Sequence, residues 1–270
     1  MDVENFRAFE HAGWVNVPVQ YHETFGSLTT QTIPVLLDVL RVETGLRLLD
    51  IATGPGYVAG AAAQHGADVV AVDFSSAMIA KARRTYPEVD FREGDAEQLP
   101  LPANVFDAAV MNFGILHLAR PDQALREACR VLKSGGRFAF TAWAPPEETV
   151  GFRIVLRAVQ EHGTVDVQLP EGPPFFRFGD PAECSRALTE AGFRSVNVVK
   201  IPQLWRLAAG DGLFNAMKES TVRTAGLLQR QSPDALRKIA DAVRTAAAPY
   251  VKDDIVELPM PALIASGAKL

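Results

Sequence analysis

The segment Leu49-Asp-Ile-Ala-Thr-Gly-Pro-Gly56 decides the fold class of this 270-residue chain. An apolar run typical of a buried strand leads into it, and a run of small residues typical of a helix follows. Gly54 and Gly56 lack Cβ atoms, so a ligand can approach the main chain there, and the free N–H groups of the helix point at that ligand. The spacing Gly54-x-Gly56-x-x-Ala59 also satisfies the dinucleotide-binding pattern. The turn therefore indicates a cofactor that contains adenosine, without distinguishing which one.

Strands and helices alternate around this segment. Further strand-like runs stand at 68–73, 89–93, 106–113 and 137–143, and helix-like runs with one apolar face separate most of them. Near-continuous apolar strands between helices are typical of a parallel sheet that is covered on both faces. We therefore predict a doubly wound, Rossmann-like α/β sheet.

The alternation changes after residue 143. The elements expected there are a helix near 151–162, a helix opened by Asp180-Pro181, a strand over 193–207, two helices within 208–250 and a strand over 255–266. We divide the chain into an N-terminal arm rich in aromatic residues (1–30) and one domain (31–270). In open α/β sheets, ligands bind outside the carboxyl ends of the strands. We therefore expect the inserts 144–180 and 208–250, together with the arm, to form a cap over a substrate chamber there.

Composition and charge exclude several classes of protein. With 48% apolar residues and a net charge of −5, the chain is typical of a globular protein without a long phosphate-binding surface, and no nucleic-acid partner is expected. Cys129 and Cys184 are too few for a disulfide framework or a zinc site of several thiolates, and no metal is expected. The acidic start lacks the features of a signal peptide, and the apolar window 51–67 is broken by four glycines and a proline. We expect a cytoplasmic protein without stable membrane insertion.

Three acidic residues stand at or just after the ends of expected strands. Asp50 precedes the glycine turn, where it would repel a pyrophosphate but attract a cationic amino-acid group. Asp73 ends the second strand and can accept hydrogen bonds from both hydroxyls of a ribose. Asp95 follows the third strand, where it can accept from an adenine amino group. These positions favour a cationic adenosine cofactor.

With these residues in place, the chain resembles the class I S-adenosylmethionine-dependent methyltransferases, and within them the small-molecule branch (type 11) that includes the quinone-biosynthesis C-methyltransferases. The resemblance covers roughly residues 30 to 143. It rests on five motifs in order: LLDIATGPG, VVAVDFSSAMIAKAR, FREGDAEQLPLP, FDAAVMNFGILHL and REACRVLKSGGRFAFTAW. It implies a seven-stranded sheet in which the last strand is antiparallel and the last pair forms a hairpin at one edge. It also implies S-adenosylmethionine as cofactor and S-adenosylhomocysteine as product.

The resemblance further implies a set of cofactor-binding residues. These are Asp50, Ala52, Gly54 and Gly56 around the methionine part, Asp73 at the ribose, Phe74 and Met78 beside the adenine, Asp95 and Ala96 at the adenine edge, and Asn112, whose backbone carbonyl meets the amino group. The family often has glycine at the position of Ala52, and Pro55 stiffens the loop. These departures concern the geometry of the loop and not the identity of the cofactor.

The expected reaction is direct in-line displacement of methyl from the sulfonium onto a small, apolar or aromatic molecule. His117 follows the fourth strand and is a candidate general base, and Tyr21 in the arm is a second catalytic candidate. Asn112-Phe-Gly-Ile115 differs from the Asn/Asp-Pro-Pro-aromatic motif of nucleic-acid N-methyltransferases. Two alternatives stay open, an NAD-type oxidoreductase and a non-catalytic cofactor-binding or interaction protein on the same fold. The sequence leaves the oligomeric state open.

Overall fold

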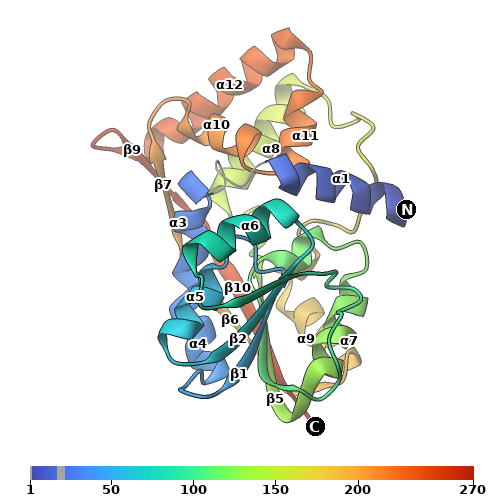
Figure 1. Cartoon of the computed structure of the whole chain (residues 1–270). Helices are drawn as coiled ribbons and strands as arrows, with labels where there is room; N and C mark the ends of the chain where they lie inside the picture. The colour runs from blue at the N-terminus through green and yellow to red at the C-terminus, as the bar shows by residue number, and fades with distance from the viewer. Residues whose placement is uncertain (1, 17–21) are drawn as a thin grey trace.

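A seven-stranded sheet forms the centre of the computed structural model, which describes residues 2–16 and 22–270 (Figure 1). The strand order is β3-β2-β1-β4-β5-β10-β6. The strands are β1 (Arg47–Ile51), β2 (Asp68–Asp73), β3 (Asp90–Glu93), β4 (Phe106–Met111), β5 (Leu132–Trp143), β6 (Phe193–Ile201) and β10 (Ala262–Lys269). Strands β1 to β5 pair in parallel, whereas β10 runs antiparallel to both β5 and β6. The predicted α/β sheet with an antiparallel last strand is confirmed.

Helices cover both faces of this sheet. One face carries α4 (Ile33–Leu40), α5 (Tyr57–Gln64) and α6 (Ser76–Thr85), and the other carries α7 (Pro121–Val131) and α9 (Pro181–Glu190). Their apolar residues form two buried clusters, one on each side of the strands. Burial on both faces explains why β1, β2 and β4 are continuous apolar runs and do not alternate with polar residues.

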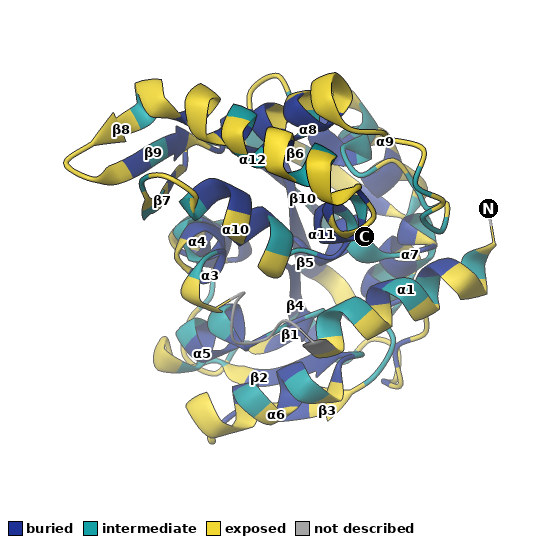
Figure 2. Ribbon diagram, turned by 90° about the horizontal axis from the view of Figure 1, so that it is seen from above, coloured by how far each residue is buried: buried dark blue, intermediate teal, exposed yellow. Residues whose placement is uncertain are grey.

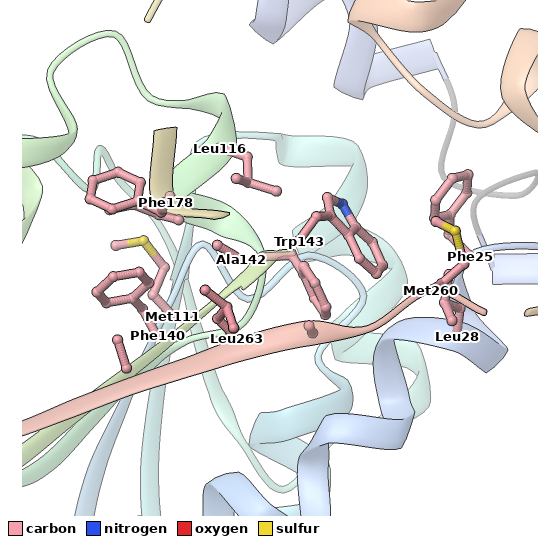
Figure 3. Packing of buried hydrophobic residues seen from close by; sticks show 14 of the residues in the cluster. Phe25, Leu28, Met111, Leu116, Phe140, Ala142, Trp143, Phe178, Met260 and Leu263 are labelled. Atoms are coloured by element: carbon pink, nitrogen blue, oxygen red, sulfur yellow. The ribbon is translucent and has the colours of Figure 1, made fainter. Parts of the chain in front are cut away.

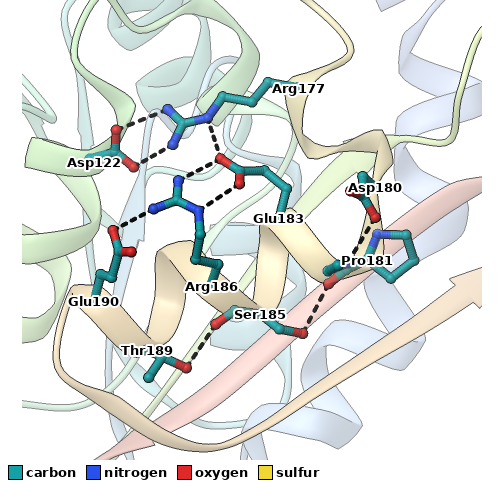
Figure 4. A network of polar contacts seen from close by, with 10 residues as sticks. Asp122, Arg177, Asp180, Pro181, Glu183, Ser185, Arg186, Thr189 and Glu190 are labelled. Atoms are coloured by element: carbon teal, nitrogen blue, oxygen red, sulfur yellow. Dashed lines mark hydrogen bonds and ion pairs between the residues drawn. The ribbon is translucent and has the colours of Figure 1, made fainter.

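Side-chain caps begin two of these helices, as the sequence predicts. The hydroxyl of Ser75 accepts a hydrogen bond from the backbone N–H of Met78 at the start of α6. Asp180 accepts from the N–H of Ala182 at the start of α9. Arg177 joins α9 to the neighbouring helix α7, because its guanidinium binds both Asp122 of α7 and Glu183 of α9 (Figure 4).

A second group of elements lies at the end of the molecule opposite the C-terminus (Figure 1). It consists of α1 (Val3–Asn16), α8 (Val150–His162), α10 (Gly212–Glu219), α11 (Arg223–Gln229), α12 (Pro233–Ala247) and a small sheet of β7 (Leu204–Ala208), β9 (Ile255–Pro259) and β8 (Val251–Lys252). Seen from above, α1 lies beside α6, and the two helices are in contact (Figure 2). No helix in the described part of the chain has the length and apolar character needed to span a bilayer.

Two expected strands of the C-terminal half are wrong in detail. The strand expected over 193–207 is interrupted after Ile201, and its second part leaves the main sheet as β7. The strand expected over 255–266 divides in the same way into β9 and β10. Pro202 and Pro261 stand at these two breaks, and proline cannot donate to a strand ladder.

Helices and connections in the C-terminal half also differ from expectation. The 208–250 insert contains three helices and not two, because α10 and α11 are separate. Strands β6 and β10 pair antiparallel at one edge of the sheet, as expected. They do not form a hairpin, since β7, β8, β9 and three helices stand between them in the chain.

Candidate functional site

A single cavity at the carboxyl ends of β1, β2 and β4 collects most of the sequence-predicted cofactor residues. Its lining includes Ala52, Gly54, Asp73, Phe74, Met78, Asp95, Ala96 and Asn112, together with His117. Asp50 and Gly56 are not part of the lining. Tyr21, the second catalytic candidate, lies outside the described residues. Other parts of the wall come from α1, from α8 and from the segment 220–224, which follows α10 and includes the first two residues of α11.

The glycine turn has the left-handed backbone that such a loop needs. Gly54 and Gly56 have φ of 55° and 85°, but Ala52 also has a positive φ of 54°. A residue with a Cβ is strained there, which explains why the family often has glycine at this position. Gly114 makes room for it, because a Cβ added at Gly114 would lie 2.6 Å from the Cβ of Ala52.

Gly56 serves the packing of the loop and does not border the cavity. A Cβ at this position would lie 2.8 Å from the Cζ atom of Phe91 on β3. At Gly54, by contrast, an added Cβ would meet no atom within 4 Å, and this residue lines the cavity. The two glycines of the motif therefore have different roles, which their spacing alone did not distinguish.

Asp50 lies behind the loop and holds it to α5. Its Oδ2 accepts hydrogen bonds from the Thr53 hydroxyl at 2.6 Å and from the N–H of Ala59 at 3.1 Å. Burial raises the pKa of Asp50 to about 7, although these two hydrogen bonds favour the ionised form and lower the pKa. Its Oδ1 has no hydrogen-bond partner among the described residues. An unpaired carboxylate oxygen beneath the loop fits a positively charged group nearby, because such a group favours the ionised acid.

Asp73, at the end of β2, joins the loop after β1 to the start of α6. Its Oδ2 accepts from the N–H of Gly54 and its Oδ1 from the N–H of Ser75, each at 2.8 Å. Each carboxylate oxygen keeps a second lone pair, so the group can still accept from two vicinal hydroxyls. Burial raises the pKa of Asp73 to about 6, although the two N–H donors favour the ionised form. This geometry fits a ribose.

Asp95 is bound by a residue that the sequence reasoning did not consider. Arg7 of α1 forms ion pairs with both Asp95 and Glu97. The Oδ1 of Asp95 also accepts from the N–H of Glu97 at 2.8 Å, and Glu97 is 5% exposed. The acid expected at the adenine edge therefore lies directly beneath the N-terminal helix.

The side chain of Asn112 is occupied by three threonines. Its Oδ1 accepts from the hydroxyls of Thr32 and Thr141, and its Nδ2 donates to the carbonyl of Thr29. These contacts fix the loop after β4 against the segment that precedes α4. Both lone pairs of Oδ1 and one of the two N–H groups of Nδ2 are used in this way, and the backbone role of Asn112 stays a prediction.

His117 belongs to a buried polar group that crosses the cavity. Its Nδ1 lies 3.0 Å from the Oε2 of Glu10, which is 1% exposed and lies on α1. Arg223 donates to the other oxygen, Oε1, at 2.8 Å, and the Trp14 indole donates to Oε2 at 3.2 Å. Burial opposes the ionisation of Glu10, but His117 and Arg223 outweigh it and hold the pKa of Glu10 below its usual value.

Sequence reasoning missed Glu10 and Arg223. They stand 107 and 213 residues from their respective partners, His117 and Glu10, so no spacing rule connects them. One signal was available in principle, since Glu10 stands four residues after Phe6 and four before Trp14 on the same face of the helix, and a charged residue needs a partner when it is buried.

Aromatic side chains form the apolar wall of the cavity. Phe113 stacks on Trp143 with ring centroids 4.1 Å apart, and Phe25 packs against Trp143 at 6.4 Å (Figure 3). Phe175 contributes from the insert, whereas Phe178 is buried away from the cavity against Phe140 (Figure 3). The wall can bury a flat, apolar ligand.

The sheet order, the glycine turn and the acid at the end of β2 are those of the S-adenosylmethionine-dependent methyltransferase fold. Residues 49–140 match the family model described as a methyltransferase domain. Several proteins with similar sequences are named as methyltransferases of quinone biosynthesis. A demethylmenaquinone methyltransferase of Paenarthrobacter aurescens is 39% identical over 112 residues, which are 42% of this chain and 44% of that protein.

Two further comparisons agree. A ubiquinone/menaquinone biosynthesis C-methyltransferase of Methylobacterium nodulans is 45% identical over 100 residues, 34% of this chain and 40% of its own length. The chain thus spans about half or less of these two relatives. Phosphoethanolamine N-methyltransferase 2 of Haemonchus contortus, in complex with S-adenosylhomocysteine, has a TM-score of 0.59 and 20% identity. That match covers 98% of this chain and 60% of the other, and shows a shared fold.

Proposed function

We propose that the chain transfers a methyl group from S-adenosylmethionine to a small apolar or aromatic acceptor by direct in-line displacement. The observation that carries the proposal is that one cavity is bordered both by the predicted cofactor residues and by an aromatic wall. S-adenosylmethionine supplies an electrophilic methyl group with its own leaving group. The protein therefore acts mainly by alignment, and such positioning can lower a barrier by about 7–11 kcal/mol.

The residues that we propose for the cofactor divide by the part that they contact. They are the loop of Ala52 and Gly54 with Asp50 and Gly56 behind it for the methionine part, Asp73 for the ribose, Phe74 and Met78 for the adenine ring, Asp95 and Ala96 for its edge, and the Asn112 backbone for the amino group. Asp73 supports this division best, because its two oxygens already face the loop and α6 and retain free lone pairs.

We propose a hydroxylated aromatic ring of the quinone class as the acceptor. The names of the relatives point to quinone chemistry, and the wall of Phe113, Trp143 and Phe175 suits a flat ring. His117 takes the hydroxyl proton, which raises the electron density of the ring carbon that receives the methyl group. The S–CH3 bond breaks as the C–CH3 bond forms, and the ring carbon then loses its own hydrogen as a proton to solvent, which restores the aromatic ring. Tyr21 stays a second candidate for this step.

The arm 1–30 and the inserts 144–180 and 208–250 form the cap of this chamber in our proposal, over the domain 31–270. Support comes from cavity-lining residues in each of them: Trp14 and Phe25, then Phe152 and Phe175, then the segment 220–224. An enclosed apolar chamber favours a small molecule over a nucleic acid. We also propose the cytoplasm as the place of action.

Binding and turnover by the full chain test the proposal. S-adenosylhomocysteine should bind in a calorimeter and NAD should not. With S-adenosylmethionine and 1,4-dihydroxynaphthalene, mass spectrometry should detect a singly C-methylated product and S-adenosylhomocysteine in equal amounts. Binding of NAD alone would favour the oxidoreductase. Binding of S-adenosylhomocysteine with no turnover across hydroxylated naphthalenes and benzenes would favour a non-catalytic protein and refute the proposal.

A further inference from the structure

We propose that Glu10 is a positioning residue that holds His117 in the one tautomer able to accept a substrate proton. The carboxylate of Glu10 and the Nδ1 atom of His117 lie 3.0 Å apart across the cavity that both residues border. The inference rests on the proposed function, because it assigns the orientation of the proposed base. According to this inference, the N-terminal helix α1 both covers the site and orients the proposed base.

Glu10 can only accept hydrogen bonds in this environment. Arg223 donates its Nε–H to Oε1, and the Trp14 indole donates its N–H to Oε2. With the charged guanidinium on Oε1 and the neutral indole on Oε2, the acid is held as a carboxylate. A neutral His117 must then carry its proton on Nδ1, and Nε2 is left as an acceptor.

The remaining surroundings of His117 agree with this tautomer. Trp14 packs edge-on against the imidazole with centroids 4.8 Å apart, and Phe175 packs at 6.1 Å. Among the described residues none hydrogen-bonds Nε2 of His117. Asp73 is the other acid whose charge acts on His117, but both of its oxygens accept from backbone N–H groups, and it forms no hydrogen bond to the imidazole.

Four segments must come together to make this arrangement. Glu10 lies on α1, and Arg223 lies on α11. Arg223 also donates to the carbonyls of Pro173 at 2.7 Å and Leu116 at 2.9 Å. Arg223 thereby links the arm, the two inserts and the loop that carries His117. The base is therefore oriented only when α1 and α11 are in place.

The substitution Glu10→Gln separates orientation from packing, because glutamine has nearly the same shape. Arg223 can only donate, so it keeps the single amide oxygen, and the amide nitrogen then faces Nδ1 of His117. That nitrogen is a donor, and it favours the opposite tautomer, in which Nε2 carries the proton. Glu4→Gln is the matched control on the same helix, since the side chain of Glu4 is 80% exposed and its ion pair with Arg120, at 3.7 Å, lies outside the cavity.

The first experiment measures the tautomer directly. The full chain, labelled with ¹⁵N at histidine, is studied by NMR at alkaline pH, and the His117 signals are assigned with His117→Gln. We expect a protonated Nδ1 in the wild type and in Glu4→Gln, and a protonated Nε2 in Glu10→Gln. A protonated Nε2 in the wild type, or an unchanged tautomer in Glu10→Gln, would overturn the inference. The wild-type measurement stands even if Glu10→Gln does not fold.

The second experiment measures turnover of 1,4-dihydroxynaphthalene. Glu10→Gln should lower kcat about 100-fold, the lower end of the usual effect of general bases. The KM for the acceptor and the Kd of S-adenosylhomocysteine should change less than about threefold, a free energy of under 1 kcal/mol. An equal loss in kcat and cofactor affinity would reduce Glu10 to a structural residue. If no acceptor is methylated but the tautomers are as expected, the proposed function fails while the orientation by Glu10 is supported.

Discussion

Replacement of Asp73 by asparagine tests the assignment at the centre of the cofactor site. Asp73 is 5% exposed and accepts N–H bonds at 2.8 Å from Gly54 and Ser75. In the amide, one of these donors faces an NH₂ group, which lowers stability by about 1–3 kcal/mol. The charged acceptors for two ribose hydroxyls are also lost, each worth about 1.5–3 kcal/mol. Complete loss of one of these two hydrogen bonds raises the Kd of S-adenosylhomocysteine at least about tenfold.

Calorimetry with S-adenosylhomocysteine measures this loss, and circular dichroism confirms that the variant is folded. Asp68→Asn is the matched control. Asp68 is the first residue of the same strand, far from the carboxyl end that borders the cavity, and its side chain is 67% exposed. Its affinity should equal that of the wild type. A folded Asp73→Asn protein with wild-type affinity would refute the assignment of Asp73 to the ribose.

Three further changes test other parts of the site and fold. Asp95→Asn should weaken binding of S-adenosylhomocysteine more than binding of its inosine analogue, because an acceptor for the adenine amino group is lost, and equal losses would contradict this role. Gly114→Ala should lower the free energy of unfolding in urea by about 1–3 kcal/mol, because the new Cβ would lie 2.6 Å from the Cβ of Ala52. The same substitution should cost less in a chain that already carries Ala52→Gly. If Gly114→Ala lowers the free energy of unfolding equally in the wild type and in Ala52→Gly, the contact between the two Cβ atoms is not the cause. Hydrogen bonds from Arg186 lower the pKa of Glu183 to about 2, so its contribution is present above its unfolded pKa of about 4.3 and is lost as the pH falls toward 2. On acidification from about pH 5 to pH 3, the free energy of unfolding should therefore fall less in Glu183→Gln than in the wild type. An equal fall in the two proteins would contradict this role of Glu183.

The carboxyl edge of the sheet could be predicted because its signals are local. A glycine turn after one strand and an acid at the end of the next are close in sequence to the elements that place them, so the predicted Gly54 and Asp73 both line the cavity. Asp50 and Gly56 belong to the same motif, yet they lie behind the loop. Whether a loop residue faces the ligand depends on the path of the loop, which Ala52 and Gly114 set together.

The sequence by itself determined the alternation of strands and helices, the α/β sheet and the carboxyl ends of the strands as the place where the cofactor residues gather, because burial on two faces and tight turns leave periodic local patterns. The number of seven strands was implied by the family resemblance. Only the tertiary structure decided the split of the last strands, the ion pairs of Arg7 with Asp95 and Glu97, and the contact of Glu10 with His117. The physical reason is that a buried charge must be paired wherever the folded chain supplies a partner, and that partner stands 107 residues away from Glu10 in the sequence.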